Sequence, residues 1–265
     1  MAGETRPFAV VTGGSNGIGY ELARQFLDNG YDVLIAAEDE SHLEEASRTL
    51  PGDGGAITTH AGDLSTEQGV DSLYRAIAGR QVDALCVNAG VGLGGAFVDT
   101  DLQRELKMID LNVRGAVQLT KLVLKDMVAR DSGKLLFTSS IAATMPDPFE
   151  AVYGATKVFL RWFGEALRNE LKDSNVGVTV LMPGVTETNF FNRADMLNTR
   201  AGASESKDDP ADVAKQAFAA LAADKHKVVP NLKNKAMAGI ADVTPAPIAA
   251  QIHRGLSEPG SADKD

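Results

Sequence analysis

The stretch FAVVTGGSNGIG (residues 8–19) places four glycines within seven residues, directly after an apolar run. The helix-like segment YELARQFLDNG (20–30) follows. Glycines at a strand-to-helix turn let the backbone approach a bulky ligand or adopt angles that a Cβ forbids. The spacing G-x-x-x-G-x-G fits neither a phosphate-binding P-loop, which needs Lys and then Ser or Thr after its last glycine, nor the common G-x-G-x-x-G dinucleotide motif. Taken alone, the stretch is equally compatible with a simple glycine-rich turn.

Strand-like and helix-like segments alternate along the rest of the chain. Apolar runs occupy 8–12, 32–37, 56–62, 83–90, 134–140 and 177–184, and helical patterns lie near 18–29, 40–49, 66–79, 101–130 and 151–173. Runs that are apolar on both faces are typical of parallel strands covered by helices on each side. The alternation therefore predicts one α/β domain with a Rossmann-like, doubly wound parallel sheet and helices on both faces.

Domain boundaries are expected near the C-terminus. The main domain is predicted over 1–230, with a lid at 188–208 and a short last strand in KHKVVPN (225–231). Residues 231–265 are an extension expected to pack on the same domain, with helical segments interrupted at Pro245 and Pro247. Its polar end, SEPGSADKD (257–265), is expected to be disordered.

Composition excludes several classes of function. A net charge of −10 over 265 residues argues against nucleic acid as a partner. The four histidines show no metal-ligand spacing, so no metal site is expected, and the single Cys86 lies in an apolar run typical of a buried core. Neither a signal peptide nor a membrane-spanning run is found, so we expect a cytoplasmic protein with no membrane partner.

Polar or turn-forming residues stand where the predicted strands end. They are Asp63, Asn88 to Gly90, Ser139 with Ser140, and Pro183 with Gly184. Each alone could be a turn, but ligands of doubly wound sheets bind at this edge. Tyr153 and Lys157 follow at i, i+4 spacing on a predicted helix, where an ammonium group could lower the pKa of the phenol and make it a general acid or base. An isolated pair of this kind is more often a surface feature.

Together these elements resemble the short-chain dehydrogenase/reductase family in its form of roughly 250 residues. The matches, in order and spacing over about residues 8–190, are TGGSNGIG (12–19), Asp63-Leu64, NAG (88–90), Asn112 in LNVRG, Ser140, YGATK (153–157) and PGVTET (183–188). The gap of 13 residues between Ser140 and Tyr153 matches the family and selects Ser140 over Ser139.

The resemblance implies an NAD(P)-dependent oxidoreductase that acts on a small carbonyl or alcohol substrate. Ser140, Tyr153, Lys157 and Asn112 are the implied catalytic residues: Tyr153 exchanges the proton, Ser140 binds the substrate oxygen, Lys157 holds the nicotinamide ribose, and Asn112 supports a water-linked proton path. The implied cofactor contacts are Gly13, Ser15, Asn16, Gly17, Ile18, Gly19, Glu38, Asp63, Leu64, Asn88, Ala89, Gly90, Tyr153, Lys157, Pro183, Gly184, Val185 and Thr188. A non-catalytic dinucleotide-binding sensor or scaffold of the same fold is the alternative, although it has no need for Ser140, Tyr153 and Lys157 together.

Three further expectations concern selectivity and assembly. Glu38, 19 residues after Gly19, favours NAD over NADP because a carboxylate accepts hydrogen bonds from ribose hydroxyls and repels a 2′-phosphate; a solvated acidic turn is the simpler interpretation. Val91, Met145, Phe149, Phe190 and Phe191 are predicted to line an apolar substrate pocket, with Met196 beside them. The apolar helices at 101–130 and 151–173 predict a homodimer or homotetramer, since the family's dimers pair these helices.

Overall fold

The computed structural model describes residues 6–52 and 54–263 of the chain. Seven parallel strands form one sheet in the order β3-β2-β1-β4-β5-β6-β7. Their bounds are β1 Phe8–Thr12, β2 Asp32–Ala37, β3 Ile57–Ala61, β4 Ala84–Val87, β5 Gly133–Thr138, β6 Val176–Leu181 and β7 Lys227–Val228. The predicted doubly wound parallel sheet is confirmed, and each predicted strand is present within a few residues of its expected bounds.

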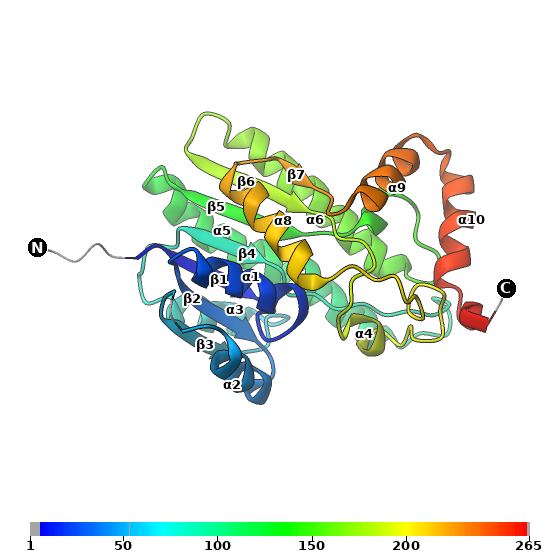
Figure 1. Ribbon diagram of the computed structural model, residues 1–265, viewed down its shortest axis with the longest axis horizontal. Helices are drawn as coiled ribbons and strands as arrows, with labels where there is room; N and C mark the ends of the chain where they lie inside the picture. Colours follow the sequence, from blue (N-terminus) through cyan, green and yellow to red (C-terminus); the bar gives the residue numbers. More distant parts are fainter. Residues whose placement is uncertain (1–5, 53, 264–265) are drawn as a thin grey trace, which may run out of the picture.

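Helices cover both faces of the sheet (Figure 1). Their bounds are α1 Gly17–Asp28, α2 Glu40–Thr49, α3 Glu67–Ala76, α4 Leu102–Ile109, α5 Ala116–Ala129, α6 Ala151–Glu170, α7 Phe190–Arg193, α8 Pro210–Ala222, α9 Leu232–Val243 and α10 Ala246–Ser257, with short 3₁₀ turns at Ile141–Thr144 and Ser261–Asp263. Side chains of β1 alternate between two cores: Phe8 and Val10 pack towards α3, α5 and α6, while Ala9 and Val11 pack towards α1, α2 and α8. This alternation explains why every residue of β1 is buried.

The long helix expected over 101–130 is interrupted. α4 ends at Ile109, residues Asp110–Gly115 form a π-helix, and α5 then begins. A π-helical turn inserts extra backbone into a helix and is found frequently at functional sites. Sequence periodicity does not reveal it, because both flanking helices keep the same apolar pattern.

The helix α8 was absent from the sequence-based expectations. Its start has clear local signals: Asp209 accepts a hydrogen bond from Ala211 N, and Pro210 occupies the first helical position. α8 packs against α1 on one face of the sheet.

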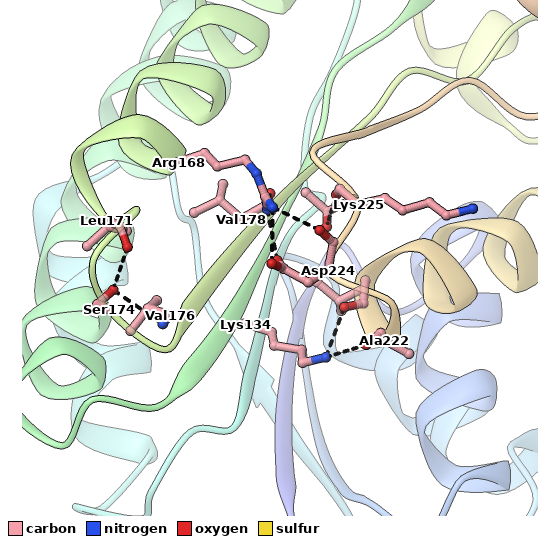
Figure 2. Close-up of polar contacts among 11 residues, drawn as sticks. Lys134, Arg168, Leu171, Ser174, Val176, Val178, Ala222, Asp224 and Lys225 are labelled. Carbon is pink, nitrogen blue, oxygen red and sulfur yellow. Dashed lines mark hydrogen bonds and ion pairs between the residues drawn. The ribbon is translucent and has the colours of Figure 1, made fainter.

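A polar cluster joins helices from both faces of the sheet (Figure 2). It lies at the end of the sheet opposite the carboxyl ends of the strands. The Arg168 guanidinium on α6 donates to the Val178 carbonyl of β6 at 2.8 Å and to both carboxylate oxygens of Asp224 at 2.8 and 3.0 Å. Lys134 of β5 donates to the last carbonyls of α8, at Leu221 and Ala222. The cluster therefore fixes the ends of α6 and α8 against β5 and β6.

The C-terminal extension forms two helices beside the carboxyl ends of the strands (Figure 1). Ala238 of α9 packs on Val180 of β6 and on Met182 directly after it, and the Leu256 carbonyl of α10 accepts a hydrogen bond from Ala201 N in the lid. The expected disorder is wrong for residues 257–263: the Ser261 hydroxyl is buried and accepts from Arg200 N at 2.9 Å. The remaining two residues of that prediction, 264 and 265, lie outside the described part of the chain.

Candidate active site

The site lies where the strand order reverses, between the carboxyl ends of β1 and β4. Asn88 joins three strand ends: its side chain donates to the Thr12 carbonyl at 3.0 Å and accepts from the Thr138 hydroxyl at 3.1 Å. The Thr12 hydroxyl in turn accepts from the backbone N–H of both Asn88 and Ala89. Asn88 is thus a structural brace that holds open the crevice in which ligands of such sheets bind.

The glycine-rich turn builds a cradle at the start of α1. Gly13 has a φ of +66°, which favours glycine, and a Cβ on Gly19 would lie 2.0 Å from the Gly13 carbonyl oxygen. The side chain of Asn16, the N-cap residue, makes no hydrogen bond to the first turn of α1, so backbone N–H groups there are available to a ligand. Free amides at a helix N-terminus suit a phosphate group, so the turn fits the pyrophosphate of a dinucleotide.

All the predicted cofactor contacts line a single cavity along this edge. They are Glu38, Asp63, Leu64, Gly13, Ser15, Asn16, Gly17, Ile18, Gly19, Asn88, Ala89, Gly90, Pro183, Gly184, Val185, Thr188, Lys157 and Tyr153. The structure therefore brings together residues from five strand ends that lie up to 175 positions apart in the sequence.

Lys107 is a residue of this region that sequence reasoning missed. Its ammonium group lies 2.9 Å from Glu38 Oε1 and 3.6 Å from Asp63 Oδ2, so one cation on α4 bridges the two carboxylates. The hydrogen bond that Lys107 donates to Glu38, together with the charges of that carboxylate and of Asp63, raises the pKa of Lys107 against the effect of partial burial. No local signal announces this contact, because the three residues lie on separate elements.

Ser140, Tyr153 and Lys157 line the same cavity. Tyr153 and Lys157 lie on one face of α6, and Lys157 Nζ donates to the Thr138 carbonyl at 3.0 Å. The Ser139 hydroxyl instead donates to the Lys157 carbonyl at 2.7 Å and anchors α6 to β5. Ser139 is thus engaged with the backbone of α6, whereas the Ser140 hydroxyl lies close enough to Tyr153 to lower the pKa of the phenol.

Burial controls the protonation of both α6 residues. It raises the pKa of Tyr153, the nearby Glu150 carboxyl raises it further, and the hydrogen bond with Ser140 only partly offsets these effects. Burial lowers the pKa of Lys157 to about 8. In the protein alone, Lys157 Nζ lies 5.7 Å from the centre of the Tyr153 ring and donates to the Thr138 carbonyl, so the expectation that Lys157 lowers the pKa of Tyr153 stays a prediction.

Asn112 is fully buried behind the cavity, within the π-helix. Its amide donates to the Val91 carbonyl at 2.9 Å and to the Thr156 hydroxyl at 3.0 Å, and its oxygen accepts from Val91 N. A Cβ on Gly90 would lie 3.1 Å from Lys157 Nζ and 3.2 Å from Asn112 Oδ1. Asn112 and Lys157 therefore both face the position that a side chain of residue 90 would occupy, and Asn112 ties the end of β4 to α6.

Four of the five predicted substrate-pocket residues, Val91, Met145, Phe190 and Phe191, line the cavity. Phe190 from the lid packs against the Tyr153 ring, with 5.2 Å between the ring centres. Phe149 does not line the cavity; its φ is +66° and its ring packs under the Arg254 guanidinium of α10. Met196 is fully buried against Phe191 and serves the lid core.

The other wall of the cavity comes from the C-terminal helices, which sequence reasoning did not connect to the site. Met237 of α9 and four residues of α10 line it: Ile252, His253, Leu256 and Ser257. Glu150, three residues before Tyr153, lines it as well. The sequence offered one signal, a polar Glu immediately before the Tyr-x-x-x-Lys helix, but nothing local links it to His253.

Comparison with known proteins agrees with this geometry. Residues 7–197 match the family described as short chain dehydrogenase. An uncharacterised short-chain type dehydrogenase/reductase of Sinorhizobium fredii is 38% identical over 187 residues, which cover 70% of this chain and 72% of that protein.

Two solved structures have a similar fold. A short-chain dehydrogenase from Sphingobium yanoikuyae in complex with NADPH has a TM-score of 0.79 and 22% identity, with 90% of this chain and 96% of that chain covered. A short chain dehydrogenase/reductase from Burkholderia phymatum in complex with NAD has a TM-score of 0.81 and 22% identity, with 91% and 94% covered. From its sequence match and its cofactor cradle, the chain belongs to the short-chain dehydrogenase/reductase family of NAD(P)-dependent oxidoreductases.

Proposed function

We propose that the protein transfers hydride between a nicotinamide cofactor and a carbonyl or secondary alcohol, with Tyr153 as general acid or base. The observation that carries the proposal is the convergence of Ser140, Tyr153 and Lys157 on the cavity that holds the cofactor cradle. The cofactor, when bound, supplies or accepts the hydride. Reduction of a carbonyl then needs one proton on its oxygen.

The chain's own residues can supply that proton. The Tyr153 phenol, whose pKa burial raises, is protonated near neutral pH and so carries the proton that the oxygen of the substrate needs as the alcohol forms. The Ser140 hydroxyl orients this oxygen beside the phenol. Lys157 holds the ribose of the cofactor, while Asn112 positions α6 and the end of β4 through its three hydrogen bonds.

Tyr153→Phe tests this role, because it keeps the ring and its packing but removes the exchangeable proton. We expect turnover of a panel of carbonyl substrates to fall by about 10²- to 10⁴-fold while cofactor binding is retained. Lys157→Met is expected to weaken both cofactor affinity and turnover. Cofactor absorbance measures the rate, and a fluorescence titration measures binding.

Tyr74→Phe is the matched control, because the Tyr74 hydroxyl donates to Asp126 on the surface and neither residue lines the cavity. Near-normal turnover of Tyr153→Phe would rule out the assigned role. If the wild type binds cofactor but reduces or oxidises no member of the panel, the alternative of a non-catalytic sensor or scaffold is favoured.

We propose NAD as the preferred cofactor. Glu38 and Asp63 place two carboxylates at the adenine end against one ammonium group, so the local charge disfavours a 2′-phosphate. The similar solved structures are compatible with either cofactor, since one is in complex with NADPH and another with NAD.

We also propose a symmetric homo-oligomer. α4 and α6 carry exposed apolar side chains, among them Leu102, Ile109, Phe159 and Trp162, and a groove between these helices is almost entirely apolar. A second copy of the same face would cover this surface. No helix in residues 6–52 and 54–263 is long and apolar enough to cross a membrane; the cytoplasmic location stays a prediction.

A further inference from the structure

A buried polar cluster lies beside Tyr153, where the first turn of α6 meets α10. Its members are Asp147, Glu150, His253 and Ser257. His253 Nδ1 lies 2.7 Å from Asp147 Oδ1, and the Ser257 hydroxyl donates to Glu150 Oε2 at 2.7 Å. The hydride chemistry proposed above assigns no task to these four side chains, although burying them costs free energy unless they are used or paired.

The Asp147 carboxylate orients the histidine ring. Its side chain is only 2% exposed and packs over Gly154, where a Cβ would come within 2.5 Å of the Asp147 Cβ. A carboxylate beside Nδ1 favours a proton on that nitrogen and directs the opposite ring nitrogen, Nε2, away from the pair. The absence of a side chain at residue 154 is what allows this arrangement beside the catalytic tyrosine.

Two atoms of the cluster remain available to a ligand. Within residues 6–52 and 54–263, His253 Nε2 and Glu150 Oε1 make no hydrogen bond. Neither atom is completely buried, so a ligand can reach both. Both residues line the cavity that also contains Ser140 and Tyr153. Polar atoms without partners at the wall of a binding cavity are the usual means of orienting a ligand.

The surroundings define what these atoms can bind. Met145, Phe190, Met237, Ile252 and Leu256 make the adjoining walls apolar. A carboxylate or phosphate would face Asp147 and Glu150, and an ammonium group would lie against the histidine, whose pKa is raised by the two carboxylates despite its burial. A hydroxyl group satisfies both atoms when the ring is the imidazolium, because it donates to the Glu150 carboxylate oxygen and accepts from the Nε2–H that this form carries.

We propose that Glu150 and His253 form a hydroxyl-binding subsite, so that the preferred substrate is a largely apolar ketone or secondary alcohol that carries a second hydroxyl group. This inference rests on the proposed oxidoreductase function. Asp147 and Ser257 are positioning residues, since they act through His253 and Glu150.

The test compares tetralone, an apolar bicyclic ketone, with a set of its ring-hydroxylated isomers. For the wild type, we expect kcat/KM of at least one hydroxytetralone to exceed that of tetralone by about 10- to 100-fold, because a site built for a hydroxyl rejects an analogue that lacks it. In Glu150→Leu and His253→Leu, this ratio should approach one, mainly through KM, while tetralone itself is still reduced. Glu150→Gln and His253→Gln, which keep hydrogen-bonding atoms, should restore part of the ratio.

His226→Leu is the matched control, because His226 is exposed next to β7. A variant that merely misfolds would lose both substrates, whereas loss of the subsite changes only their ratio. An unchanged ratio in both leucine variants overturns the proposal. So does stoichiometric zinc or manganese in the purified protein that is lost in His253→Leu, because Asp147, Glu150 and His253 would then be metal ligands.

A readout independent of turnover separates this proposal from the proposed function. The chain has four histidines, so the His253 imidazole signal can be assigned by NMR with His253→Gln. A saturating hydroxytetralone, with cofactor, should shift that signal, whereas tetralone should not. If no tetralone is reduced but the selective shift is seen, the catalytic assignment fails and the subsite stands. Equal shifts, or none, overturn the subsite.

Discussion

At the scale of single residues, the buried Glu150 carboxyl is expected to make the free energy of unfolding depend on pH. Burial, followed by the charge of Asp147, raises its pKa to about 7, from an ordinary value of 4.5. The folded protein therefore binds this proton more tightly than the unfolded chain does. The resulting stabilisation is fully present below pH 4.5 and is lost as the pH rises through about 7.

We expect the free energy of unfolding of the wild type to decrease across this window, and the decrease to be smaller by about 1–3 kcal/mol in Glu150→Gln. Urea denaturation at several pH values measures it. Glu170→Gln, an exposed position on the same helix, should follow the wild type. Parallel profiles for wild type and Glu150→Gln would show that the carboxyl keeps its ordinary pKa.

Single residues are also expected to set the preference between NAD and NADP. If Glu38 excludes a 2′-phosphate, Glu38→Arg should change the ratio of the NAD and NADP dissociation constants by about 10- to 100-fold towards NADP. Lys107→Met should move the ratio the other way, because it leaves both carboxylates without their cation. Glu40→Arg, two residues further on at the start of α2, is the control. Tighter binding of NADP than of NAD by the wild type would contradict the proposal.

At the scale of elements, Arg168 and Asp224 connect α6, β6 and the end of α8 (Figure 2). The contact is partly exposed, so a moderate contribution is expected. A double-mutant cycle with Arg168→Met and Asp224→Asn should give a coupling free energy of about 1–2 kcal/mol from thermal or urea unfolding. Arg48→Met, whose guanidinium donates within its own helix, should cost less. Additive single and double variants would mean that the cluster does not hold the elements together.

At the scale of the whole molecule, the apolar face of α4 and α6 determines assembly. Phe159 and Trp162 are 38% and 58% exposed on this face. We expect the wild type to sediment as a dimer or tetramer at micromolar concentration, and Phe159→Lys with Trp162→Lys to sediment as a monomer, because buried lysines without partners disrupt an apolar interface. Ile248→Lys, on the exposed side of α10, should retain the wild-type state. A monomeric wild type would contradict the proposed oligomer.

Local patterns were sufficient for most of the architecture. Strand and helix periodicities depend on neighbours in sequence, so the six main strands and the helices at 17–28 and 40–49 could be placed to within a few residues. The π-helix at 110–115 could not, because its extra residue is accommodated by Asn112 reaching Val91 and Thr156 on other elements. The end of the chain was misjudged for a similar reason: its polar composition suggests disorder, but Ser261 is buried by the lid.

The sequence by itself determined the doubly wound sheet, the glycine-rich cradle and the Ser140, Tyr153 and Lys157 set, since each is written in short motifs with characteristic spacing. Only the tertiary structure decided what surrounds them. Lys107 reaches Glu38 across 69 positions, and Ser257 reaches Glu150 across 107. Such contacts depend on how α4 and α10 pack against the rest of the fold. That packing is the sum of many weak apolar contacts, and it leaves no short pattern in the sequence.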